Sequence, residues 1–412
     1  MSGKKRICIL TQSHLCRNPR VVKEANALNE AGYDVTILTT FALDKLLKED
    51  KTLINTREIN YKGIINLIPG QSSGWSILKH RLVKRLAEEL AGRFNIETIS
   101  AAGYGYCKNL RGAKAENADL YICHEEISTI MGCKLIEAGY KVAFDFEDWY
   151  SHAFSGESGK RRPSKLFEKY EKYALKHGLL CYTTSHSLSS ALAEFAGSEK
   201  PRVLNNVFPL AERNQNDHLN KDKGGSTVFS IHWYSQTIGP DRGLEIVAKA
   251  LALVPNPVEL HLRGLLTGNY KAEFEGVFPY NKGHKLIFHD LVPHLELTSR
   301  IMEHDVGLAS ELYEPVNRNL TIVNKIMQYL LAGIAVIASD TDGQKEVAGK
   351  APESVFLYSQ NNPEQLAKQI SLLVSDHEKL EFARKTALRI SEEYFCWDVQ
   401  KSWLLGWIKN II

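Results

Sequence analysis

Short apolar segments alternate with helix-forming segments along nearly the whole chain, and this alternation restricts the possible folds more than any other feature. Each segment is a continuous apolar run, and a helical stretch separates it from the next. Because buried strands separated by helices need both faces of their sheet covered, the pattern predicts parallel, doubly wound α/β sheets. The strands expected in the first half are 6–11, 34–40, 64–68, 119–123, 142–146 and 180–184.

A polar segment at 211–226 interrupts the alternation, and we expect it to be a linker or an exposed loop. The alternation then resumes, and a chain of 412 residues is too long for one ordinary core. We therefore predict two Rossmann-like domains, 1–210 and 226–394, that face a central cleft holding the active site. The strands expected in the second domain are 227–231, 258–263, 286–289, 306–309, 335–339 and 355–358, and its expected helices are 242–253, 295–303, 323–332 and 363–374.

Composition excludes several classes of protein. With 44% apolar and 24% charged residues the chain is ordinary for a globular protein, and a net charge of +3 is too small for a dedicated nucleic-acid binder. The seven cysteines are scattered without a C-x-x-C pair, which predicts reduced thiols and no structural metal site. No apolar run reaches the roughly 18 residues of a membrane span, and the N-terminal run is too short for a signal peptide, so we expect a cytoplasmic protein.

Two amphipathic segments bear on where the protein lies in the cell. In 75–93, leucines recur every four residues beside lysines and arginines. Such a helix either belongs to the domain with a solvated basic face or lies on an anionic membrane, here the inner face of the plasma membrane. The last segment, 395–412, has an apolar stripe rich in tryptophan, and we expect it to dock back on the first domain. Membrane contact is the alternative for this segment too.

Polar residues follow the predicted strands, where open parallel sheets bind their ligands. His124 ends one strand of the first domain and is a candidate contact to a sugar, with a purely structural histidine as the alternative. Glu147 and Asp148 follow the next strand as an acidic pair or as caps of the following segment. In the second domain, Arg263 and Gly264 end a strand in the same way.

Two helix starts in the second domain suit a phosphate, because a helix N-terminus offers free N–H groups and a positive dipole end. Arg242 opens one helix and adds a bidentate donor. Asn324 and Lys325 open another, where Lys325 is expected to neutralise a diphosphate. Gln328, one turn further on, is expected to hydrogen-bond a ribose. The alternative for each is a solvated surface residue. Glu346 is a further candidate beyond the strand 335–339.

Five motifs in order give the chain a family resemblance. They are RNPRVVKEA at 17–25, DLYICHEE at 119–126, FDFEDWYS at 144–151, HWYSQTIGPDRGLE at 232–245 and NKIMQYLLAGIAVIASDTDGQKEV at 324–347. Together they resemble the retaining GT-B glycosyltransferases of the GT4 group, also called glycosyl transferases group 1. The resemblance covers nearly the whole chain, and it includes a last helix that crosses back to the first domain.

The resemblance implies transfer of a sugar, with retention of configuration, from a UDP- or GDP-sugar to a glycan or lipid-linked acceptor in surface polysaccharide or glycoconjugate assembly. It implies no tightly bound cofactor or metal, since basic residues stabilise the leaving diphosphate. Its catalytic residues are expected to be His124, Arg242 and Lys325. The donor-binding residues are expected to be Arg242, Arg263, Gly264, Asn324, Lys325, Gln328 and Glu346.

The chain departs from the family pattern at three positions. Gln328 replaces the second glutamate of the E-x7-E pair, Leu320 replaces the first, and Glu147 replaces a histidine. Glu311 and Glu314 are alternative carboxylates for the sugar. These departures motivate a second hypothesis, a catalytically silent GT-B subunit that binds a nucleotide sugar or a partner. A third hypothesis is another two-Rossmann enzyme, either a nucleotide-sugar epimerase or a dinucleotide enzyme. No G-x-G-x-x-G follows the first strand, which counts against the dinucleotide version.

Overall fold

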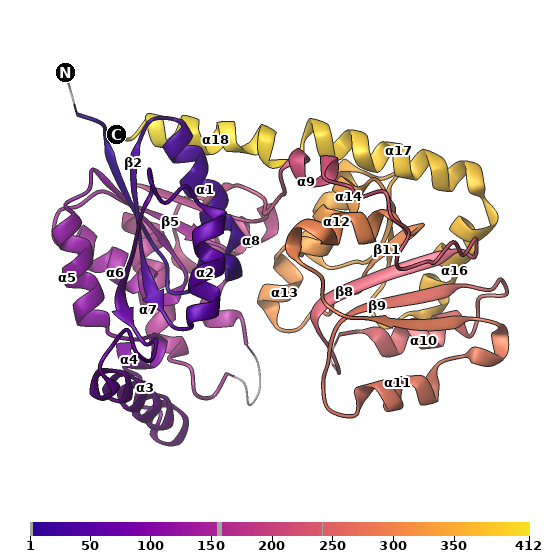
Figure 1. The fold of residues 1–412 in the computed structure, drawn as a ribbon, viewed down its shortest axis with the longest axis horizontal. Coiled ribbons are helices and arrows are strands. Elements are labelled where there is room, and N and C mark those ends of the chain that lie inside the picture. The colour runs from indigo at the N-terminus through magenta and orange to yellow at the C-terminus, as the bar shows by residue number, and fades with distance from the viewer. Residues whose placement is uncertain (1–2, 155–158, 241) are drawn as a thin grey trace. The chain divides into compact units, whose positions relative to one another are not determined.

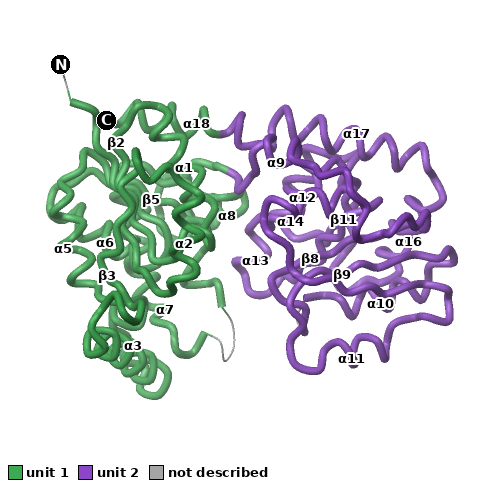
Figure 2. Tube along the Cα trace, in the orientation of Figure 1, with its two compact units in different colours: residues 1–204, 401–412 green, residues 205–400 purple. Residues whose placement is uncertain are grey.

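The computed structural model describes residues 3–154, 159–240 and 242–412, which form two compact units (Figures 1 and 2). Unit 1 comprises Met1–Leu204 and Lys401–Ile412, and unit 2 comprises Asn205–Gln400. Each unit contains one sheet of parallel strands connected by helices. The prediction of two doubly wound α/β halves is therefore confirmed.

The sheet of unit 1 has seven strands in the order β3-β2-β1-β4-β5-β6-β7. All five residues of β4 and of β5 are buried, as expected for strands covered on both faces. Strand order reverses between β1 and β4, which places a ligand-binding switch point at their carboxyl ends. The strands are β1 (Arg6–Leu10), β2 (Asp34–Phe41), β3 (Asn60–Asn66), β4 (Leu120–His124), β5 (Val142–Phe146), β6 (Leu180–Thr183) and β7 (Arg202–Val203).

The helices of unit 1 begin and end largely where local sequence signals place them. Asn18 caps α1 by accepting a hydrogen bond from the Val21 amide, and Pro19 occupies the first turn. In the final helix, α18, the Trp407 ring lies 6.2 Å from the Tyr182 ring, both within unit 1. The helices are α1 (Pro19–Glu30), α2 (Asp44–Leu53), α3 (Gly74–Phe94), α4 (Ile99–Ala102), α5 (Tyr106–Glu116), α6 (Glu126–Ile136), α7 (Ser164–His177), α8 (His186–Ala196) and, from Lys401 onward, α18 (Trp397–Lys409).

The sheet of unit 2 has six strands in the order β10-β9-β8-β11-β12-β13, with its switch point between β8 and β11. The strands are β8 (Ser230–Ile238), β9 (Glu259–Leu266), β10 (Lys285–His289), β11 (Val306–Ala309), β12 (Ala335–Ser339) and β13 (Val355–Tyr358). The helices are α9 (Leu210–Asn214), α10 (Leu244–Leu251), α11 (Tyr270–Val277), α12 (His294–Met302), α13 (Val316–Leu320), α14 (Asn324–Ala332), α15 (Asp342–Lys350), α16 (Pro363–Ser375) and α17 (His377–Glu393).

Three expectations about individual segments are wrong in detail. The third strand is Asn60–Asn66 rather than 64–68, and β8 continues to Ile238 through an irregularity in its pairing with β9. The segment 211–226 is not simply an exposed linker, because the Asp222 side chain is only 6% exposed and is paired with the buried Arg263. Ion pairs with groups far away in sequence, which local polarity does not reveal, hold this segment against unit 2. No helix in the described part of the chain combines the length and the hydropathy that a bilayer span requires.

Candidate functional site

The carboxyl edge of the unit 2 sheet gathers several of the predicted donor-binding residues. Lys325, in the first turn of α14, is buried, and its amine forms an ion pair with Glu311, just beyond β11. The same amine lies 5.2 Å from the centre of the Trp233 ring. Gln328, also buried, accepts a hydrogen bond from the Tyr234 hydroxyl at β8. The helix start, its lysine and its glutamine therefore lie together at the switch point.

Glu311 fixes the position of Lys325. Its backbone amide donates to the Ser339 hydroxyl over 2.8 Å, and that hydroxyl lies 2.8 Å from the Glu311 carbonyl oxygen. The second carboxylate oxygen of Glu311 lies 4.0 Å from Nε of Arg318. Glu311 is therefore held between two cations, and its carboxylate is committed to orienting Lys325. Sequence reasoning considered Glu311 as a sugar contact and missed this pair, because no local spacing links the two residues.

Tyr234 fixes the orientation of Gln328 in the same manner. Burial, reinforced by the negative charges of Glu212 and Glu311, holds the pKa of Tyr234 well above its ordinary value. The hydroxyl therefore remains a proton donor, and it occupies the amide oxygen of Gln328. The amide NH2 group of Gln328 is the part that remains to contact a ligand.

Arg242 lies at the same edge of the sheet, in the loop between β8 and α10. Helix α10 begins at Leu244, two residues later than Arg242, and Gly243 before it has a φ of 73°. The guanidinium of Arg242 donates to the Thr237 hydroxyl over 3.2 Å. The carbonyl of Arg242 accepts from the Ser310 hydroxyl, next to Glu311, over 3.3 Å. Arg242 therefore lies beside the loop that carries Glu311, the partner of Lys325.

In unit 1, His124 is surrounded by carboxylates and is completely buried. Its Nδ1 lies 2.9 Å from Glu147 and 3.3 Å from Asp145, and its Nε2 lies 3.2 Å from Glu24. Arg20 forms a bidentate pair with the Asp145 carboxylate. Burial opposes a charge on His124, yet Glu24, Glu147 and Asp145 together raise its pKa well above the ordinary value. His124 is therefore an imidazolium locked into an ion-pair network.

Comparison with known proteins decides the class of the molecule. Residues 231–376, which include Arg242, Lys325 and Gln328, match the model of the family Glycosyl transferases group 1. Sucrose-phosphate synthase from Thermosynechococcus elongatus is a similar solved structure, with a TM-score of 0.72, 15% identity and coverage of 99% of each chain. The chain is a glycosyltransferase with the GT-B fold.

Two further solved structures are similar to this glycosyltransferase. HepE from Anabaena, in complex with UDP-glucose, has a TM-score of 0.69 and 15% identity, with coverage of 98% of this chain and 99% of that chain. WaaG, a glycosyltransferase involved in lipopolysaccharide biosynthesis, has a TM-score of 0.61 and 10% identity, with coverage of 96% of this chain and 98% of that chain. No curated protein matches the glycosyltransferase by sequence.

The remaining predicted residues are placed as follows. Arg263 is buried and donates to the Asp290 carbonyl over 2.5 Å, as well as pairing with Asp222. Gly264 has a φ of 156°, and a Cβ there would lie 2.6 Å from the Ser235 carbonyl oxygen, so the close passage of β8 and β9 requires glycine. Asn324 accepts from the Asn206 amide over 3.1 Å, and Glu346 is half-buried in α15. These contacts do not bring Arg263 to the Lys325 pair.

The sequence analysis also missed three members of the His124 network, namely Arg20, Glu24 and Asp145. Arg20 and Glu24 lie four residues apart in α1, and both are buried. Two opposite charges four residues apart on the apolar face of a helix indicate a buried ion pair, and this pattern could have identified them from the sequence. Asn18, which caps α1, also donates to Glu147 over 2.8 Å and so ties the start of the helix to the network in this glycosyltransferase.

Proposed function

We propose that the enzyme transfers a sugar from a nucleotide-diphosphate sugar with retention of configuration, in the manner of the GT4 group. The observation that carries this proposal is the Glu311–Lys325 pair at the start of α14, beside Gln328 and Arg242. UDP and GDP donors both suit such a site. Because HepE is described in complex with UDP-glucose, a UDP-sugar is the first donor to test.

In this proposal the site acts on the leaving diphosphate. The Lys325 amine, the Arg242 guanidinium and the free N–H groups of the first turn of α14 supply positive charge where negative charge develops during transfer. Glu311 holds the lysine in place before the donor arrives, so little reorganisation accompanies the reaction. Gln328 turns its NH2 group to the ribose hydroxyls in the place of the usual glutamate.

A charge-balanced variant tests the donor site. Lys325→Ala alone removes the nearer of the two cations beside the buried Glu311, so the double variant Glu311→Gln/Lys325→Gln, which removes both charges of the pair, accompanies it. We expect each to lower the transfer rate by about 100-fold, the effect typical of losing one transition-state donor. Binding of UDP is measured by calorimetry and transfer by release of UDP, with exposed Lys249→Ala as the matched control.

Two outcomes of these measurements contradict the proposal. Normal transfer in both variants shows that the diphosphate lies elsewhere. Donor binding by the unmodified protein, without turnover on any glycan or lipid-linked acceptor, favours the catalytically silent subunit.

We further propose that the acceptor is lipid-linked and reached at a membrane surface. The leucine stripe of α3 is exposed, and Trp75 at its start is 82% exposed. Beside α3 an open cavity of about 820 Å³ is lined by apolar and basic side chains of α3 and α5. Exposed apolar side chains with interspersed lysine and arginine suit an anionic bilayer. The residues that line the cavity include Trp75, Lys79, Leu82, Lys84, Tyr104, Tyr106, Lys108 and Arg111.

Vesicle sedimentation tests this acceptor surface. We expect the protein to bind vesicles containing phosphatidylglycerol and not vesicles of phosphatidylcholine alone, because the surface combines basic and apolar groups. Trp75→Ser/Leu86→Ser, which alters only exposed positions, is expected to release the protein. Leu253→Ser, another exposed apolar position but in unit 2, is the control. Two results contradict the proposal and point to a glycan acceptor in solution. Either the Trp75→Ser/Leu86→Ser variant and the Leu253→Ser control sediment equally with the vesicles, or the unmodified protein does not bind the vesicles.

A further inference from the structure

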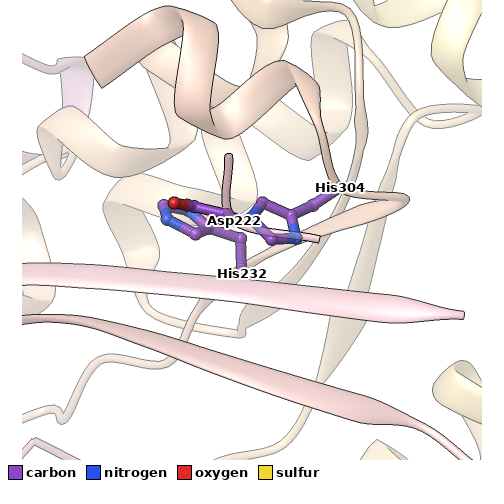
Figure 3. A group of neighbouring side chains, drawn as sticks. All are labelled: Asp222, His232 and His304. Carbon is purple, nitrogen blue, oxygen red and sulfur yellow. Dashed lines mark hydrogen bonds and ion pairs between the residues drawn. The ribbon is translucent and has the colours of Figure 1, made fainter. Parts of the chain in front are cut away.

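Four histidines from separate segments gather on unit 2, and none of them is among the residues assigned to the donor. His232 of β8 and His304, just beyond α12, stack with ring centres 4.7 Å apart. His261 of β9 and His289 of β10 stack at 5.2 Å, and His261 lies 4.5 Å from His304. Asp222, from the segment 217–226, reaches the same place. Figure 3 shows Asp222, His232 and His304 close together, with Asp222 on a segment separate from the strand that carries His232.

His232 is the unexplained member of this group. Its side chain is completely buried, and among the described residues neither ring nitrogen has a hydrogen-bond partner. His304 is also buried, and its Nδ1 atom has no hydrogen-bond partner among the described residues. Buried polar atoms are nearly always paired, so the two unpaired nitrogens of the His232 ring in particular require an explanation. A bound metal ion would explain them, and the types and positions of the donor atoms test this explanation.

The donor atoms suit a transition metal. One ligand atom each from Asp222, His232 and His304 lies within 4.8 Å of the others. The Asp222 Oδ2 and His304 Nε2 atoms are 3.4 Å apart. Ligands bound to zinc at about 2.0–2.2 Å in a tetrahedron are separated by roughly the same distance. Two imidazoles and one carboxylate are a donor set that zinc and its neighbours accept, whereas magnesium and calcium prefer oxygen.

We propose that Asp222, His232 and His304 bind a divalent transition-metal ion, with zinc as the first candidate. The ion would join three segments, the 217–226 segment, β8 and the turn after α12, into one unit. Its role is structural, and it is separate from the proposed transfer of a sugar. The expectation from the cysteines, that no structural metal is present, did not consider histidines so far apart in sequence.

The surroundings favour metal binding in two ways. Burial lowers the pKa of His232 well below its ordinary value and also lowers that of His304, so neutral rings offer their lone pairs at neutral pH. Arg263 donates to the Asp222 carboxylate and holds it, as outer partners of metal ligands commonly do.

Metal content and binding test the proposal in the full-length protein. After removal of metals with a chelator, we expect calorimetry with zinc chloride to show one saturable equivalent, and cobalt(II) to give the visible absorption of a tetrahedral site. Zinc is expected to raise the melting temperature, because it binds only the folded state. His232→Phe is expected to weaken zinc binding by more than about 100-fold, beyond the loss typical of changing an outer partner.

The control is His218→Ala, which removes an exposed histidine from the same segment as Asp222 and is expected to retain binding. Asp222→Asn provides a second ligand variant if His232→Phe does not fold. Absence of a saturable equivalent in the unmodified protein overturns the proposal. Unchanged zinc affinity in a folded ligand variant overturns it as well. Because every readout concerns the metal, failure here leaves the proposed transfer reaction untouched.

Discussion

His124 in unit 1 and His232 in unit 2 are both completely buried, yet their neighbours have opposite character. Three carboxylates surround His124, and Arg20 forms ion pairs with two of them, Asp145 and Glu24. The His232 ring stacks on another imidazole, and its nitrogens have no hydrogen-bond partner among the described residues. Burial disfavours the charged ring at both places.

The difference shows that charged neighbours can override the effect of burial on the pKa of a histidine. The carboxylates outweigh burial at His124 and raise its pKa, which makes the ring a cation. At His232 burial and the adjacent His304 act in the same direction and lower the pKa, which keeps the ring neutral. His124 in the first cluster has carboxylates within ion-pair distance of both ring nitrogens, whereas neither nitrogen of His232 in the second has a hydrogen-bond partner among the described residues. Each prediction below changes one side of this contrast.

The largest effect is expected from Arg20→Met. The change leaves the fully buried Asp145 without its bidentate partner, and breaking a buried pair in this way typically costs about 3–5 kcal/mol. Hydrogen exchange in peptides that contain β4 and β5 measures the local free energy of opening in unit 1. The double variant Arg20→Met/Asp145→Asn is expected to lose less, because no unpaired charge remains. Equal losses in the single and double variants would show that the ion pair is not what stabilises unit 1.

A smaller contrast is expected between His124→Phe and His232→Phe in metal-free protein. Loss of His124 removes the partner of Glu24 and Glu147 and is expected to cost about 3 kcal/mol, at the low end for breaking a buried pair. Loss of His232 removes no hydrogen bond, so a ring of similar shape is expected to cost less than about 1.5 kcal/mol. Thermal melting and hydrogen exchange of each unit compare the two variants. A costlier change at His232 would reverse the comparison.

The sequence predicts what depends on local pattern. The alternation of apolar segments gives both sheets, Asn18 and Pro19 give the start of α1, and the start of α14 brings Lys325 and Gln328 together. Local pattern does not give pairs made across the fold. The Glu311–Lys325 pair and the burial of Asp222 in a polar segment both depend on partners that only the folded chain supplies.

The smallest expected effect concerns pH. As the pH falls from 7 to 5, titration of His261 is expected to lower the stability of unit 2, whereas titration of Glu171 is expected to raise that of unit 1. Burial, reinforced by His304 and His289, lowers the pKa of His261 to about 3. In the unfolded chain the pKa of this histidine is about 6.5. The stability that the neutral ring contributes to unit 2 is therefore fully present above that pH, and it is lost as the pH falls toward 3. Between pH 7 and pH 5 the loss amounts to about 1–2 kcal/mol in metal-free protein.

In unit 1, burial also lowers the pKa of His80 and His152, but two other groups act in the opposite direction over the same range. The raised pKa of His124 keeps its contribution present at low pH and lost only as the pH rises through the folded value. Burial raises the pKa of Glu171 to about 7, so its protonation below pH 7 adds stability to unit 1. Hydrogen exchange at pH 7 and pH 5, corrected for the intrinsic exchange rate, is expected to show a larger loss of protection in unit 2 than in unit 1. His261→Gln removes the titrating ring and is expected to lessen the loss, and an unchanged pH response in that variant would assign the acid sensitivity to another group.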